Sequence, residues 1–143
     1  MTERLDLTSL RSAVTSLAEG VSTIENAAWM GAQTAAVRKI LLAGTIQNFE
    51  FVYELAFKMI RRQLELEAAS PSEVDESSFR DVVRSAAQRG LIDDVEAWFG
   101  YRQMRNLTSH TYDQERARQV WKGIPAFLGE ARRLLARLEI RNA

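Results

Sequence analysis

Residues 7–28, LTSLRSAVTSLAEGVSTIENAA, carry apolar side chains at alternating steps of three and four. These side chains are Leu7, Leu10, Val14, Leu17, Val21, Ile24 and Ala28. Because an α-helix turns once in about 3.6 residues, this spacing gathers them along one side of a helix. The stretch predicts an amphipathic first helix, with residues 29–32 as the connection to the next one.

The following stretch, residues 33–69, predicts a long second helix. It should end before Pro71, because the residue that precedes a proline is pushed out of the α region. One face of this helix carries Glu50, Glu54 and Lys58, and Glu54 stands one turn before Lys58 in the orientation that favours an ion pair. We therefore expect this face to be solvated.

Three further helices are expected after a polar loop. Ser78 is placed to cap the third helix, and Gly90 is placed to end it. Asp93, with Glu96 three residues later, resembles a capping box at the start of the fourth helix. Asp113 is placed to cap the fifth helix.

The fifth helix carries a strict apolar stripe. Pro125 lies within it and is expected to kink the helix, because proline cannot donate the backbone hydrogen bond of its position. The stripe consists of Val120, Trp121, Ile124, Phe127, Leu128, Ala131, Leu134, Leu135 and Leu138. Together the five stretches predict an all-α, antiparallel four- to five-helix bundle, with residues 1–143 forming a single domain.

The composition excludes several classes of chemistry. The chain has no cysteine, which excludes disulfides, thiol catalysis and cysteine-bound zinc. A single histidine argues against a histidine-based metal site, so we expect neither a metal nor a cofactor. We find no signal-peptide pattern and no apolar run of about 20 residues, and we expect a cytoplasmic protein that does not contact a membrane.

The charges balance overall but are divided unevenly along the chain. Residues 101–143 carry 9 Lys/Arg and 4 Asp/Glu, a formal charge of +5, whereas residues 1–100 carry a formal charge of −5. This positive excess suits a phosphate-bearing partner. It equally suits an internal match between the basic and the acidic parts of the chain.

The segment RNLTSHTY, residues 105–112, lies in the positive region and contains the only histidine of the chain. Arginine stays protonated and offers a planar fork of donors to phosphate oxygens, whereas histidine exchanges a proton near neutral pH. A protein that cleaves a phosphodiester needs both functions, which Arg105 and His110 could supply. Simpler roles also fit: His110 as a helix-end cation, Tyr112 as a core residue, and Arg105 as the partner of an acid of the bundle.

The fourth predicted helix has two faces of interest. One face carries Ala97, Tyr101, Met104 and Leu107. The other begins with Val95, Trp98 and Phe99 and continues with Arg102, Arg105, Asn106 and His110. A solvated face would not begin with large apolar residues, and a core face would not end with polar ones. We therefore expect Val95, Trp98 and Phe99 to form a contact surface for a second subunit that opens into a polar cleft, although exposed apolar patches also mark other partners.

Two segments resemble the signatures of one protein family. The pattern R-x4-H-x-Y in residues 105–112 resembles the motif of the HEPN superfamily. More closely, it resembles that of the HepT-like proteins, also called nucleotidyltransferase substrate-binding proteins. Residues 49–58, FEFVYELAFK, look like the second-helix signature of the same proteins. Helix order and overall length agree with the family as well.

The resemblance implies a helical bundle that dimerises with both motifs facing one composite cleft, and a metal-independent endoribonuclease activity. On this basis His110 transfers a proton while a ribose 2′-hydroxyl attacks the adjacent phosphate. Arg105 holds the phosphate and Asn106 supports the cleft, with Arg102 as either a supporting residue or a solvated neighbour. RNA is the expected substrate, because the reaction needs its 2′-hydroxyl.

The resemblance also implies a toxin–antitoxin pair. Its antitoxin is a cognate minimal nucleotidyltransferase that transfers AMP to the tyrosine of the motif, here Tyr112. Phosphates placed two residues from His110 would block the cleft and repel RNA. Many proteins of this kind are described only as substrate-binding partners. The alternative is therefore a non-catalytic substrate-binding subunit of a two-component nucleotidyltransferase.

Overall fold

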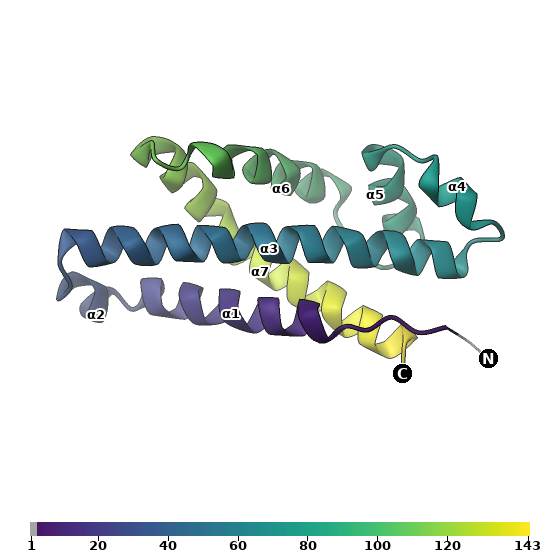
Figure 1. Cartoon of the computed structure of the whole chain (residues 1–143), viewed down its shortest axis with the longest axis horizontal. Helices are drawn as coiled ribbons and strands as arrows, with labels where there is room; N and C mark the ends of the chain where they lie inside the picture. Colours follow the sequence, from purple (N-terminus) through teal and green to yellow (C-terminus); the bar gives the residue numbers. More distant parts are fainter. Residues whose placement is uncertain (1–2) are drawn as a thin grey trace.

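The computed structural model describes residues 3–143, and over these residues it contains helices and turns but no β-strand. The predicted all-α bundle is confirmed. In chain order the elements are α1 Thr8–Glu25, α2 Ala27–Gly31, α3 Ala35–Glu67, α4 Pro71–Asp75, α5 Phe79–Gln88, α6 Val95–Leu107, the 3-10 turn η1 Thr108–His110, and α7 Gln114–Arg141 (Figure 1).

The long helix α3 runs the length of the molecule and organises the other elements (Figure 1). Helix α1 lies antiparallel along one side of α3, while α4, α5 and α6 lie along the other side. Helix α7 crosses α3 and packs against α1, α3 and α6. The segment before α1 contacts the end of α7, where the backbone N–H of Leu5 donates to the Asn142 side chain at 2.9 Å.

The predicted caps are confirmed at three helix ends. Ser78 accepts from the backbone N–H of Asp81 and starts α5, and Asp113 accepts from that of Glu115 and starts α7. Gly90 follows α5 with φ +76°, a left-handed conformation that a glycine adopts without a steric cost. Local sequence chemistry therefore fixes both ends of α5 and the start of α7.

Three boundary predictions were wrong. The first helix ends at Glu25, because the Asn26 side chain accepts from the N–H of Trp29 and starts the separate helix α2. Asp94, not Asp93, caps α6 by accepting from the N–H of Ala97, while Asp93 binds Arg137 at 3.0 Å. The expected polar loop after α3 contains α4, which begins at a proline.

Helix α7 continues through Pro125 from Gln114 to Arg141, and the kink at Pro125 stays a prediction. Among residues 3–143, no helix combines the length and the apolar character needed to cross a bilayer.

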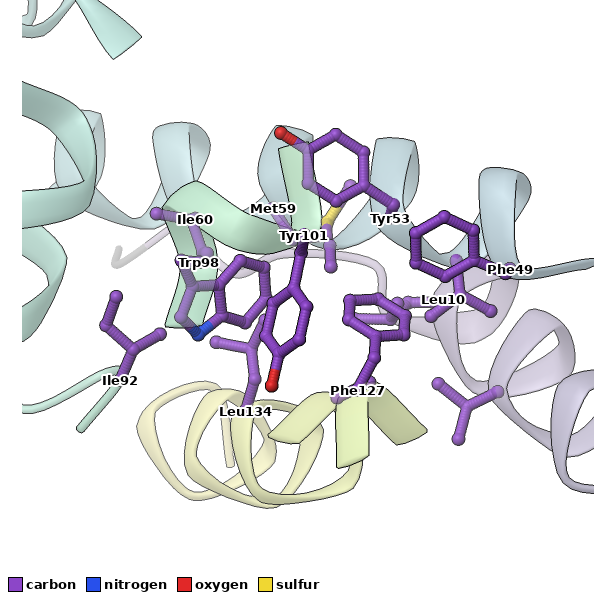
Figure 2. Close-up of a cluster of buried hydrophobic side chains, with 14 of the residues drawn as sticks. Leu10, Phe49, Tyr53, Met59, Ile60, Ile92, Trp98, Tyr101, Phe127 and Leu134 are labelled. Carbon is purple, nitrogen blue, oxygen red and sulfur yellow. The ribbon is translucent and has the colours of Figure 1, made fainter. Parts of the chain in front are cut away.

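Phe127 of α7 lies at the centre of an aromatic cluster that joins three helices (Figure 2). Its ring meets those of Phe49 on α3 and Tyr101 on α6 edge to face, with 4.9 Å between ring centroids in both pairs. The ring of Trp98 on α6 lies 6.0 Å from that of Phe127, and the ring of Tyr53 on α3 lies 6.5 Å from it. Edge-to-face packing is a favoured arrangement of aromatic rings, so the cluster fixes α6 and α7 against α3.

The position of Trp98 corrects one expectation about the dimer interface. Its side chain is fully buried among residues of its own chain, against Tyr101 and Phe127, and it cannot contact a second subunit. The apolar start of this face of α6 is therefore partly core. Val95 and Phe99 are half-buried, and their place in a dimer interface stays a prediction.

We expect Phe127→Ala to lower the free energy of unfolding by about 3–5 kcal/mol, because the truncation leaves a cavity among four aromatic side chains. Urea denaturation followed by circular dichroism measures this change. Ile140→Ala is the matched control on the same helix, since its side chain is 76% exposed and its loss should cost less than about 0.5 kcal/mol. Equal effects of the two changes would contradict a central role for Phe127.

Candidate functional site

The residues of the R-x4-H-x-Y segment lie at the corner where α6 ends and α7 begins. Arg105 is in the last turn of α6, and His110 ends the 3-10 turn η1. The Thr108 hydroxyl donates to the carbonyl of Arg105 at 2.7 Å, and the Thr111 hydroxyl donates to that of Thr108 at 3.1 Å. These local hydrogen bonds fix the backbone of the corner and therefore the position of His110 relative to Arg105.

Arg105 reaches across to α3 and binds two acids that stand one turn apart. Its Nη2 and Nε atoms donate to Glu54 Oε1 at 2.6 and 2.9 Å, and Nη2 lies 3.4 Å from Glu50 Oε1. The hydrogen bond with Glu54 raises the pKa of the Arg105 guanidinium. Because 31% of the Arg105 side chain and 52% of the Glu54 side chain remain exposed, water screens this pair.

This pairing corrects the expectation for the polar face of α3. Glu54 bonds to Arg105 rather than to Lys58, because α6 lies over this face and presents a cation to it. The alternative role of Arg105, as the partner of an acid of the bundle, is confirmed. The sequence analysis did not identify Glu50 and Glu54 as joint partners of Arg105. Their spacing of four residues, which places both on one face of the helix, could have indicated a shared partner.

His110 and Tyr112 are both exposed at the corner. Their rings are 6.2 Å apart at an angle of 68°. Tyr112 is 79% exposed, so the alternative role of Tyr112 as a core residue is wrong. The other two tyrosines of the chain, Tyr53 and Tyr101, are buried. The His110 side chain is exposed, so its imidazole is accessible to a ligand.

Arg102 and Asn106 face another neighbour, helix α5. The Arg102 guanidinium lies 4.2 Å from the ring centroid of Phe79, and Asn106 lines an open groove between α5 and α6. Arg102 therefore packs on an aromatic ring instead of being only a solvated neighbour. The structure thus places the predicted residues along one end of α6, with Arg105 turned to α3 and Arg102 turned to α5.

Within the described part of the chain, no group of three histidine, aspartate or glutamate side chains is arranged to hold a metal ion. The chemistry that these side chains can supply themselves is proton exchange at His110 and anion binding at Arg105.

The sequence pattern of the family described as "nucleotidyltransferase substrate binding protein like" matches residues 5–140. The chain belongs to this family. The match spans α1 to α7, so both the corner and its acidic partners on α3 lie inside the family domain.

Relatives of this substrate-binding family support the assignment. A Haemophilus influenzae protein named "Probable ribonuclease HepT" is 45% identical over 142 residues, which are 99% of this chain and 97% of that protein. A solved Haemophilus influenzae structure, described as revealing the fold of a substrate-binding domain of a nucleotidyltransferase, superposes with a TM-score of 0.92. It is 44% identical and covers 94% of this chain and 99% of its own. A crystal structure from Thermus thermophilus has a TM-score of 0.61 at 25% identity, covering 85% of this chain and 98% of its own. The resemblance stated from the sequence is therefore confirmed.

Tyr53, the member of the aromatic cluster that lies near Arg102 and Arg105, provides a test of the packing around Arg105. Burial raises the pKa of Tyr53 to about 12, against the opposing effect of the nearby Arg102 and Arg105 cations. In the unfolded chain the phenol ionises near its usual pKa of about 10. Between these two values the folded state holds a proton that the unfolded state has lost, so stability falls as the pH rises.

We expect the wild type to lose about 1.4 kcal/mol more per pH unit than Tyr53→Phe between about pH 10 and 12. The measurement is the free energy of unfolding in urea at several pH values. Between about pH 7 and 9 the two proteins should differ only by a constant offset, which serves as the control. Parallel curves above about pH 10 would show that the Tyr53 phenol is not buried.

Proposed function

We propose that this protein is a HepT-like endoribonuclease that cleaves RNA by attack of a ribose 2′-hydroxyl on the adjacent phosphate. The observation that carries the proposal is the exposed imidazole of His110 on a corner that also holds Arg105. The name of the Haemophilus influenzae relative, a probable ribonuclease, supports the same activity.

In the proposed reaction the 2′-oxygen forms a bond to phosphorus and the bond from phosphorus to the 5′-oxygen breaks. The products are a 2′,3′-cyclic phosphate and a free 5′-hydroxyl. His110 accepts the proton of the 2′-hydroxyl, and Arg105 neutralises the charge that develops on the phosphate oxygens. This route needs no metal-bound water. Asn106, one residue from Arg105, supports the cleft by hydrogen bonding.

A homodimer is part of the proposal. Two copies of the corner facing one cleft would supply two imidazoles, so one can accept the 2′ proton while the other donates a proton to the leaving 5′-oxygen. The side chain of Val95 is half-buried in the single chain, which leaves apolar surface on α6 for a second subunit.

Arg105 must release Glu54 before it can hold a phosphate. Its main partner, Glu54, is an exposed carboxylate, and exposed ion pairs contribute only about 0–1 kcal/mol. A phosphodiester that approaches the corner can therefore replace Glu54 at little cost. In the absence of RNA, Glu50 and Glu54 keep the guanidinium in a defined place beside α3.

We expect the wild type to cleave a mixed RNA pool in EDTA and His110→Ala to cleave it about 10²–10⁴-fold more slowly, since His110 is the proton-transfer group. Gel analysis of end-labelled RNA measures the rate. Ser109→Ala is the matched control, because the neighbouring Ser109 side chain is exposed and bonds only to the carbonyl of Asn106. If His110→Ala cleaves RNA as fast as the wild type, His110 is not the proton-transfer group.

We further propose that a cognate minimal nucleotidyltransferase acts on this protein as the antitoxin of a toxin–antitoxin pair, by transferring AMP to Tyr112. The exposure of Tyr112 supports this, because an acceptor phenol must enter the active site of a second enzyme. The structure described as a substrate-binding domain of a nucleotidyltransferase supports a partner of this class.

Co-expression with the nucleotidyltransferase should add AMP to Tyr112 alone and abolish the ribonuclease activity. Peptide mass spectrometry checks the position, and the buried Tyr53 and Tyr101 serve as internal controls in the same molecule. Tyr112→Phe should remain free of AMP and stay active in the presence of the nucleotidyltransferase. AMP found on another residue of the chain would contradict the assignment.

The alternative is a non-catalytic substrate-binding subunit, and the description of the solved Haemophilus influenzae structure favours it. This function predicts a stable complex with the nucleotidyltransferase and no RNA cleavage by AMP-free, folded protein. The cleavage assay on protein shown to be unmodified by intact mass therefore separates the two functions.

A further inference from the structure

Helices α5 and α6 lie on the same side of α3 (Figure 1). The groove between them combines arginines with aromatic rings immediately beside the proposed site. It has a volume of about 390 Å³ and is open to solvent. Phe79 and Arg80 line it from α5, and Phe99, Arg102 and Asn106 line it from α6. Asn106 directly precedes the last residue of α6, so the groove leads to the corner that carries Arg105 and His110.

The two rings hold the guanidiniums in place. Arg102 lies 4.2 Å from the ring centroid of Phe79, and Arg80 lies 4.5 Å from that of Phe99. Arg84, one turn after Arg80, lies 5.9 Å from Phe99. A guanidinium over an aromatic ring is held by cation–π attraction, yet its N–H donors at the edge remain available. Less side-chain freedom is then lost when a phosphate binds.

The groove is also positively charged. Among the described residues, Arg80 and Arg102 form no ion pair, and Arg84 has only a 3.8 Å contact with the exposed Asp81. The described residues that line the groove include no acidic side chain. Other arginines of the chain, such as Arg105 and Arg141, are paired with acids of α3. The cations left without carboxylates in the groove thus favour an anionic occupant.

We infer that this groove binds the single-stranded RNA that flanks the cleaved phosphodiester. The arginines contact its phosphates, and one or two bases stack on Phe79 and Phe99 or on the guanidinium planes that cover them. Grooves that combine positive charge with aromatic side chains bind single strands in this way, because every base has a face that can stack. The inference rests on the proposed function, since it extends that site along the same RNA.

The same charges argue against other occupants. If a second copy of this chain docked symmetrically on the groove, the arginines of the two grooves would face each other. Repulsion between these like charges disfavours such a dimer. A duplex keeps its bases stacked inside and offers none to the two phenylalanines. A single strand satisfies both features of the groove.

The test measures binding of a labelled single-stranded RNA of about 12 nucleotides, a length suited to such grooves. The protein carries His110→Ala so that the RNA survives, and the buffer contains EDTA. Fluorescence anisotropy gives the affinity at several salt concentrations, and cleavage of the same RNA by the wild type is assayed in parallel.

Adding Phe99→Leu should weaken binding by about fivefold or more through loss of base stacking. Adding Arg80→Gln should weaken binding and reduce the slope of log affinity against log salt by about one unit. Arg132→Gln is the matched control, because Arg132 is an exposed arginine that lines a groove between α1 and α7. Arg80→Gln changes an exposed side chain, so this arm does not depend on the stability of the core.

Affinities of the Phe99→Leu and Arg80→Gln proteins equal to that of the Arg132→Gln control would overturn the inference. If the wild type still cleaves the RNA, the proposed function survives that result. Groove-dependent binding without cleavage by the wild type would support the groove and overturn the nuclease. If the variants that lose RNA binding also have a smaller hydrodynamic size than the control, the groove is a subunit interface, and this result would overturn the inference.

Discussion

The edge-to-face packing of Phe127 against Phe49 and Tyr101 is the interaction on which the site depends. These contacts tie the middle of α7 to α3 and α6, with Trp98 closing the cluster (Figure 2). Gly123, one turn before Phe127, lets α6 approach closely, because a Cβ there would lie 2.5 Å from Met104 Sδ. With α6 held against both α7 and α3, Arg105 reaches Glu54 and the corner acquires a fixed place. The geometry of the polar residues is therefore a consequence of aromatic packing in the core.

The distribution of charge in three dimensions differs from its distribution along the chain. Part of the positive excess of residues 101–143 is neutralised internally, since Arg105, Arg137 and Arg141 bind Glu54, Asp93 and Glu67. Among the described residues, the arginines that form no ion pair include Arg80, which comes from the part of the chain with net negative charge. Net charge per segment was thus a poor guide to an anion-binding surface. An anion-binding surface is better indicated by neighbouring arginines that form no ion pair in the folded protein.

The helices and many of their ends could be predicted from the sequence, because they follow from local chemistry. The three-and-four spacing gave α1, Ser78 and Asp113 gave two helix starts, and Gly90 gave a helix end. The resemblance to the family signatures provided the proposed site residues. The rotation of α6 could not be predicted, because large apolar residues stand on both of its faces. Only the presence of Phe127 on a distant helix decides that Trp98 and Tyr101 are both core residues. The ion-pair partner of Glu54 was also predicted wrongly. The sequence shows that Lys58 lies one turn away on the same helix, but it does not show that Arg105 of another helix packs against Glu54.

The exposed ion pair of Arg105 also gives the proposed AMP modification a physical route to inhibition. Tyr112 lies two residues from His110, with its ring 6.2 Å from the imidazole. A phosphate attached to Tyr112 would be held at a high effective concentration near the corner, as any tethered ligand is. Arg105 exchanges a screened carboxylate for a phosphate at little cost, so the tethered group would compete with RNA for that cation. The weakness of the Arg105–Glu54 pair would thus serve both proposed states, because it would let the guanidinium bind RNA in the free protein and the attached nucleotide in the modified one.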